Sequence, residues 1–138
     1  VDEEAQSVEI APVYDCSSCL YPQLDLERMK SVLQSEEEMD RRVYVFPSSS
    51  IEENGVKIPY FDFISSLRYP ECNEALQRIN ARIDWDGIQQ FLDNIPELLP
   101  IQREFYLTML TVRKEKILDH SLELLLAQEQ RPHAQELT

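Results

Sequence analysis

The chain has 138 residues, 43% of them hydrophobic, and carries a formal net charge of −13 from 26 acidic and 13 basic side chains. This length suits one domain with its own core, and the negative charge repels nucleic-acid phosphates and anionic lipid surfaces, so we expect no direct contact with nucleic acid or membrane. No apolar run approaches the roughly 20 residues that span a bilayer, and three cysteines without a disulfide framework favour a cytoplasmic location.

The composition favours helices. The chain contains only 2 Gly but 8 Pro and is rich in Leu, Glu and Gln, which is typical of helices joined by Pro-marked turns. We therefore predict a mainly α protein with a small β-hairpin. Its parts would be an extended segment over residues 1–22, a helical domain over 23–128 and a frayed tail over 129–138.

The extended segment contains a short apolar run, Ile10-Ala11-Pro12-Val13-Tyr14, followed by the carboxylate of Asp15. Hard cations such as Mg²⁺ use one or two carboxylates together with phosphate oxygens, so Asp15 is a candidate metal ligand. It can also cap a turn, which is the role that the residue pattern alone favours. Because a lone carboxylate catalyses little by itself, we expect the other members of such a site upstream of Val1 and interpret the chain as a fragment.

Two helices are predicted next. Asp25 is placed to cap the first, whose apolar face is formed by Leu26, Met29, Val32 and Leu33. Ser35, followed by three glutamates, resembles a capping box that opens the second helix. That helix has Met39 facing inward and two basic residues near its C-terminal end, Arg41 and Arg42.

A small β-hairpin is predicted near residues 43–58. Its signals are the β-branched and aromatic run Val43-Tyr44-Val45-Phe46 and the tight-turn pair Asn54-Gly55. A short buried helix with dense aromatic packing is expected between Tyr60 and Pro70. The aromatic residues of the chain are interpreted as core rather than as a ligand cage: Tyr44, Phe46, Tyr60, Phe61, Phe63 and Trp85.

Three further helices complete the domain. The first repeats apolar residues at helical spacing (Cys72, Leu76, Ile79 and Ile83), and the second is capped by Asp84 or Asp86. The third is the longest and begins at Pro100, which suits the first turn of a helix. Its largely apolar stripe comprises Ile101, Phe105, Met109, Val112, Lys116 and Ile117.

The cysteines and histidines give weak functional signals. Cys16 and Cys19 have the spacing of a zinc or redox pair, but zinc requires four ligands and no second pair follows. We therefore interpret the cysteines as small apolar residues packed near a turn. His120 and His133 lack partners at catalytic spacing, and His120 is expected on the surface of its helix.

The run from Ile10 to Asp15, with the following residues 16–22, resembles the metal-binding segment of the HipA-like serine/threonine kinases. In that family an apolar-Ala-Pro-x-Tyr-Asp stretch takes the role that Asp-Phe-Gly has in other protein kinases. The resemblance implies that Asp15 holds Mg²⁺ against the phosphates of ATP and that Tyr14 lies near the nucleotide. It extends to a helical bundle of the C-lobe type through three further runs: Arg42–Pro47, Tyr60–Ile64 and Arg103–Tyr106.

The chain also departs from that family. It contains no phosphate-covering loop, no lysine placed to reach the phosphates and no catalytic loop of the form His-x-x-Asp-x-His-x-x-Asn. We therefore expect the fragment itself to be inactive and to bind neither Mg²⁺ nor ATP tightly. The full-length parent would phosphorylate a protein serine or threonine. The resemblance is also compatible with a parent that acts as a toxin and is restrained by an antitoxin.

Two further expectations concern partners. A lobe separated from its kinase would expose apolar surface and self-associate through it. The alternative function is a noncatalytic helical interaction domain with an acidic surface, in which Asp15 only caps a turn. The natural partner of such a domain would be a basic protein surface.

Overall fold

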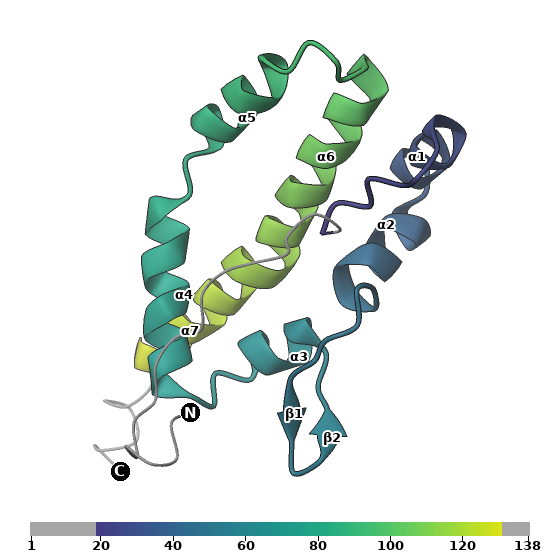
Figure 1. The fold of residues 1–138 in the computed structure, drawn as a ribbon. Helices are drawn as coiled ribbons and strands as arrows, with labels where there is room; N and C mark the ends of the chain where they lie inside the picture. Colours follow the sequence, from purple (N-terminus) through teal and green to yellow (C-terminus); the bar gives the residue numbers. More distant parts are fainter. Residues whose placement is uncertain (1–18, 131–138) are drawn as a thin grey trace, which may run out of the picture.

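The computed structural model describes residues 19–130, and the remaining residues, 1–18 and 131–138, lie outside the described part. The described residues are mainly helical with one small antiparallel hairpin (Figure 1), which confirms the predicted fold class. In chain order the elements are α1 (Leu26–Leu33), α2 (Glu36–Tyr44), β1 (Glu52–Glu53), β2 (Val56–Lys57), α3 (Tyr60–Ser65), α4 (Pro70–Arg82), α5 (Trp85–Asp93), α6 (Pro100–Arg113), the π-helical segment η1 (Lys114–Asp119) and α7 (His120–Gln130).

The last three elements, α6, η1 and α7, follow one another without a break and form a long helical rod. In Figure 1 this rod runs diagonally through the molecule, with α1 and α2 along one side and α4 and α5 along the other. Pro100 occupies the first turn of α6, where its missing N–H costs no helical hydrogen bond. The predicted long final helix is thus confirmed and serves as the support for the other elements.

Side-chain caps begin α1, α2 and α5. In each case a carboxylate or hydroxyl accepts a hydrogen bond from a backbone N–H of the first turn, which would otherwise lack a partner. The bonds are Arg28 N to Asp25 Oδ1 (2.7 Å), Glu38 N to Ser35 Oγ (3.2 Å) and Gly87 N to Asp84 Oδ1 (2.9 Å). The caps predicted at Asp25 and Ser35 are confirmed, and Asp84 rather than Asp86 caps α5.

The buried core lies between α1, α2 and α6. It contains Met29, Val32, Met39, Phe105 and Met109, of which all but Met39 are fully inaccessible to solvent. The spacing of three or four residues places the members from one helix on a single face. This core fastens the first two helices to the rod.

None of the aromatic residues predicted as core is fully buried, although Tyr44, Phe61, Phe63 and Trp85 are half-buried. Phe46 and Tyr60 are 47% and 40% exposed, and α3 has no buried residue. Aromatic rings do meet around α3, where Phe61 lies edge-on to Tyr44 and stacks on His120, at 5.0 and 5.7 Å between ring centroids. The prediction of an aromatic core was wrong because methionine and valine side chains from α1 and α2 already cover the buried face of α6.

The β-hairpin is shorter than the sequence pattern predicted. Val43 and Tyr44 belong to helix α2, and the strands pair only Glu52 with Lys57 and Glu53 with Val56. Val43 lies one turn after the core residue Met39 and is buried as well, so helical packing overrides its β propensity. The turn itself is as predicted, with left-handed φ values of 53° and 79° at Asn54 and Gly55.

Two smaller predictions were also wrong. Cys19 and Cys72 are exposed free thiols rather than packed residues, while Cys16 lies outside the described residues. On α4 the predicted apolar face buries Leu76 but leaves Ile79 54% exposed. His120 is exposed, as expected.

Replacement of a buried side chain by alanine tests whether the core centres on α6. We expect Phe105→Ala to lower the free energy of unfolding by about 3–5 kcal/mol, because the ring is fully buried and its removal leaves a cavity. Phe91→Ala is the matched control, since that ring is 68% exposed, and should cost less than about 1 kcal/mol. Urea denaturation of both variants measures the difference, and equal effects would contradict the described core.

Candidate functional site

The two residues implied to bind metal and nucleotide, Asp15 and Tyr14, lie outside the described residues. Their roles therefore stay predictions. The structure describes how the chain is anchored immediately afterwards, at Cys19 and Tyr21, and which residues of the rod hold it there.

Arg113, the last residue of α6, binds two backbone carbonyls that are far apart in the sequence. Its Nη1 donates to the Cys19 carbonyl at 2.8 Å, and its Nε and Nη2 donate to the Arg42 carbonyl at 3.3 and 3.1 Å. A guanidinium group presents its donors as a rigid planar fork, so one side chain can hold two backbone segments at once. Arg113 thus joins the segment that follows Asp15 both to α2 and to the rod.

Tyr21 completes this arrangement. Its hydroxyl donates to the Phe46 carbonyl at 2.8 Å, and the guanidinium carbons of Arg42 and Arg113 lie 5.5 and 5.8 Å from its ring centroid. Its φ of 56° is in the left-handed region, which is unfavourable for a residue with a side chain and is kept only where surrounding contacts hold it. We call Cys19, Tyr21, Arg42 and Arg113 the Arg113 junction.

Glu38 provides the negative charge beside the junction. Its carboxylate accepts a hydrogen bond from Arg42 Nη1 at 2.9 Å and also pairs with Arg28 and Arg41 at 3.3 and 3.6 Å. The hydrogen bond from Arg42, aided by the neighbouring positive charges, lowers the pKa of Glu38 below its ordinary value of 4.5. The carboxylate therefore stays ionised and keeps Arg42 beside Tyr21.

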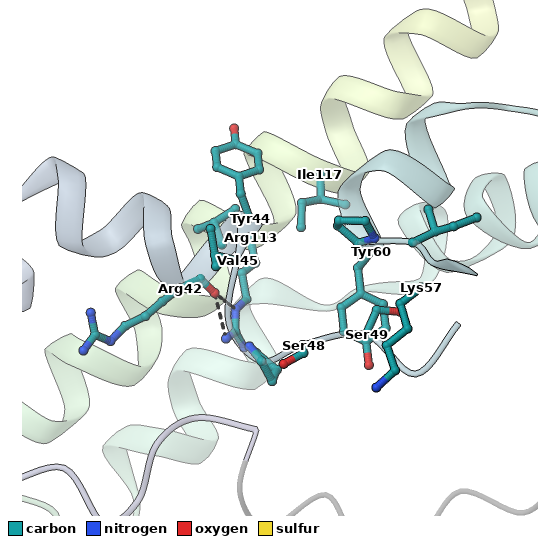
Figure 2. A pocket seen from close by; sticks show the side chains of 13 residues that line it. Arg42, Tyr44, Val45, Ser48, Ser49, Lys57, Tyr60, Arg113 and Ile117 are labelled. Atoms are coloured by element: carbon teal, nitrogen blue, oxygen red, sulfur yellow. Dashed lines mark hydrogen bonds between the residues drawn. The ribbon is translucent and has the colours of Figure 1, made fainter. Parts of the chain in front are cut away.

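A pocket of about 370 Å³ lies next to the junction, between the end of α2, the loop after it, β2, the start of α3 and the rod (Figure 2). Its walls are mostly apolar and include Val45, Pro47, Ile58, Pro59 and Ile117. Figure 2 shows Arg113 bonded to the Arg42 carbonyl at one wall, with the Arg42 side chain directed away from the other lining residues. This surface suits packing against an apolar group.

The described residues contain neither a metal-binding group nor a membrane-spanning helix. Within residues 19–130, no group of three or more His, Cys, Asp or Glu side chains is placed to hold a metal ion. No helix in this part of the chain is long and apolar enough to cross a membrane. The candidate site in this part of the chain consists of an anchored backbone segment and an adjoining apolar pocket.

Sequence reasoning did not identify Arg113 or Tyr21 as important. A signal for Arg113 was present, because it continues the row formed by Ile101, Phe105 and Met109 at intervals of four residues. A charged residue at the end of such an apolar row is buried only where partners satisfy its donors. No comparable pattern marks Tyr21, whose role depends on a backbone conformation.

No protein-family model matches the chain. The serine/threonine-protein kinase CtkA of Helicobacter pylori is 42% identical over 116 residues, which is 83% of this chain and 36% of the kinase. The chain is homologous to a protein kinase. A crystal structure of a Helicobacter pylori proinflammatory kinase CtkA also matches, with a TM-score of 0.75 and 42% identity over 83% of this chain and 41% of that one. The chain thus spans well under half the length of both kinase chains.

The altered pKa of Glu38 predicts how stability depends on pH. Because the pKa is lower in the folded than in the unfolded chain, the Glu38 pairing stabilises the fold above about pH 4.5 and is lost as the pH falls through the folded value. Glu38→Gln should therefore lose less stability than the wild type on acidification. The measurement is urea denaturation from about pH 7 to about pH 3.

Glu37→Gln is the control for this comparison, since Glu37 is an exposed acid in the same turn of α2. It should follow the wild-type pH profile closely. If Glu38→Gln followed that profile as well, the ion pairs around Glu38 would contribute nothing to the stability of the junction.

Proposed function

We propose that the chain is the C-terminal helical portion of a HipA-like serine/threonine kinase, whose full-length form transfers the γ-phosphate of ATP to a protein serine or threonine. The observation that carries this proposal is the 42% identity to a serine/threonine kinase over 83% of the chain. The Ala-Pro-x-Tyr-Asp motif at residues 11–15 adds the assignment to the HipA-like group. In cells the parent would act on a cytoplasmic protein substrate. One form of this kinase would be a toxin that an antitoxin restrains.

The residues proposed to serve the kinase reaction are Asp15 and Tyr14. A carboxylate oxygen is a ligand that Mg²⁺ prefers, so Asp15 fits a metal that also contacts phosphate oxygens. Residues 19–130 hold no metal-binding cluster of their own, so the other ligands would come from ATP and from kinase residues outside this described part. When bound, Mg²⁺ neutralises charge on the transferring phosphoryl group. Tyr14 would lie beside the nucleotide.

The described fold would support this site rather than complete it. Arg113 anchors the backbone four residues after Asp15, and the core of α1, α2 and α6 holds Arg113 in place. The sequence holds neither the catalytic loop nor the phosphate-binding lysine that phosphoryl transfer requires. We therefore propose that the isolated chain does not transfer phosphate and binds Mg²⁺ and ATP weakly.

Removal of the carboxylate at position 15 tests the proposed function. In the full-length parent, Asp15→Asn should reduce transfer from γ-labelled ATP to background, because an amide carries no charge to hold Mg²⁺ against the phosphates. Circular dichroism should show an unchanged fold. Asp86→Asn, which changes an exposed acid in the first turn of α5, should keep wild-type activity.

The two outcomes separate the two functional classes. Loss of transfer in Asp15→Asn alone supports the kinase. Equal transfer by both variants would rule out Asp15 as the metal ligand and leave the kinase assignment in place. No transfer by the wild-type parent would instead favour the acidic helical interaction domain.

The apolar surface around the pocket is proposed to pack against the rest of the kinase. Val45 lines the pocket and is 55% exposed, and Tyr60 on the same pocket is 40% exposed. Apolar groups exposed together in this way are typical of contact surfaces. In the isolated chain the same surface would drive self-association.

A charge on this surface should prevent that association. We expect Val45→Asp to shift the isolated chain toward the monomer in sedimentation equilibrium, because association would then bury a carboxylate. Ile79→Asp is the matched control, since Ile79 is 54% exposed on α4 and does not line the pocket. A monomeric wild-type chain, or equal effects of the two substitutions, would contradict the assignment of this surface.

A further inference from the structure

Three arginines converge where α1 meets α2. Arg28 comes from α1, Arg41 and Arg42 come from the last turn of α2, and all three lie within 3.6 Å of the Glu38 carboxylate. The core between the two helices and α6 holds their backbones in this arrangement. A pocket of about 190 Å³ opens between them, which we call the arginine pocket; its walls are Tyr21, Arg28, Glu38, Arg41, Arg42 and Phe46.

The arginine pocket is positively charged in a strongly acidic chain. Its walls carry three guanidinium groups and one carboxylate, a net charge of +2, whereas the whole chain carries −13. Guanidinium groups that lie this close together repel one another, and the single carboxylate of Glu38 neutralises only one of them. The charge that remains is balanced by an anion that brings about two negative charges.

The guanidinium groups also retain hydrogen-bond donors for such an anion. Each guanidinium has five N–H donors. Within residues 19–130, the Arg28 side chain makes one hydrogen bond, to Glu38 at 3.3 Å, and Arg41 approaches Glu38 only to 3.6 Å, which is too long for a hydrogen bond. Both side chains are about half exposed, at 51% and 54%, so their remaining donors are accessible from solvent.

Arg42 provides a fixed wall between these two mobile donors. Its side chain is only 13% exposed, and its Nη1 donates to both the carbonyl and the carboxylate of Glu38 at 2.9 Å. Its Nε is buried and has no hydrogen-bond acceptor among the described residues. The pocket therefore has one guanidinium group held in place and two that can close on a ligand.

The size and rim of the pocket limit what it can hold. Pockets for drug-sized molecules have volumes of about 300–1,000 Å³, so a pocket of about 190 Å³ suits a single small group rather than a whole nucleotide. At the rim the Phe46 ring is 47% exposed and offers an apolar surface beside the charged groups. A free inorganic anion makes no use of that surface, whereas the side chains of a peptide can pack on it.

We propose that the arginine pocket binds the phosphate group of a phosphorylated serine or threonine in a peptide segment. Such a group carries about 1.5 to 2 negative charges at pH 7, which matches the net charge of the pocket. Its oxygens also fit the planar donor forks of Arg28 and Arg41. A carboxylate brings a single charge and leaves part of the excess unbalanced. This site goes beyond the proposed function, because binding does not require that the parent transfers phosphate.

The test is a titration of the ¹⁵N-labelled 138-residue chain, followed by NMR. The probe is a short peptide in which leucines flank one phosphoserine. It should shift the side-chain Nε–Hε signals of Arg28, Arg41 and Arg42 in a saturable manner, and the same peptide with unmodified serine should leave them in place. Inorganic phosphate should bind at least about fivefold more weakly than the phosphopeptide, since it lacks apolar contact with Phe46.

Substitutions in the chain locate the site. Arg28→Gln and Arg41→Gln should each weaken phosphopeptide binding by about tenfold, because each removes charge-assisted hydrogen bonds. Arg82→Gln is the matched control: it removes the same charge from an exposed position on α4, across the rod from α1 and α2 (Figure 1), and should change the affinity by less than about twofold. Glu38→Gln should tighten binding by about threefold, since it removes the negative charge from the pocket.

Each result decides the proposal. The absence of saturable shifts at the three arginines, or equal losses of affinity in Arg41→Gln and Arg82→Gln, would overturn it. If inorganic phosphate bound as tightly as the phosphopeptide, the pocket would be a site for free anions only, and equal binding of a peptide with glutamate in place of phosphoserine would exclude selection of phosphate. Tighter binding by Glu38→Gln would support the proposal in a way that a misfolded variant cannot imitate.

Discussion

The described structure depends on the bonds that the Arg113 guanidinium makes at the end of α6. Apolar contacts between α1, α2 and α6 bring these helices together, but such contacts have no direction and tolerate small shifts. The carbonyls of Cys19 and Arg42 are instead bound at defined positions by one rigid group. Arg113 continues the row of buried α6 residues, so the face that forms the core also ends in the group that orders the adjoining backbone. Apolar packing and directed hydrogen bonds therefore both join α2 to α6.

This arrangement requires local compensation of charge in a strongly acidic chain. Arg42 is largely buried, with 13% of its side chain exposed, and a buried guanidinium is tolerated only with partners for its charge. Glu38 supplies that partner and holds Arg28 and Arg41 as well. The same three glutamates that open α2 therefore have two effects, since they favour the start of the helix and one of them fixes Arg42 beside Tyr21.

The surface of the chain fits a part of a larger kinase. The chain matches 36% of the curated kinase, and several large apolar side chains of the described part remain exposed, including Val45, Tyr60 and Ile79. Under the proposed function the rest of the kinase would cover the surface near the pocket and supply the groups that act on phosphate. The chain described here would then contribute one carboxylate and the framework that holds it.

The sequence by itself determined the local features, because these depend on residues close together in the chain. The caps at Asp25 and Ser35, the tight turn at Asn54-Gly55 and the long helix after Pro100 were all predicted, and the cap of α5 was narrowed to Asp84 or Asp86. The candidate ligand Asp15 was identified from its motif and stays a prediction. The helical spacing also predicted the buried residues of α1, α2 and α6, namely Met29, Val32, Met39, Phe105 and Met109. Only the tertiary structure decided which aromatic residues stay outside that core: it left Phe46 and Tyr60 exposed and made Val43 helical, because packing against neighbouring elements overrides local propensity. The Arg113 junction also required the fold, since its members are separated by up to 94 positions and no local pattern brings them together.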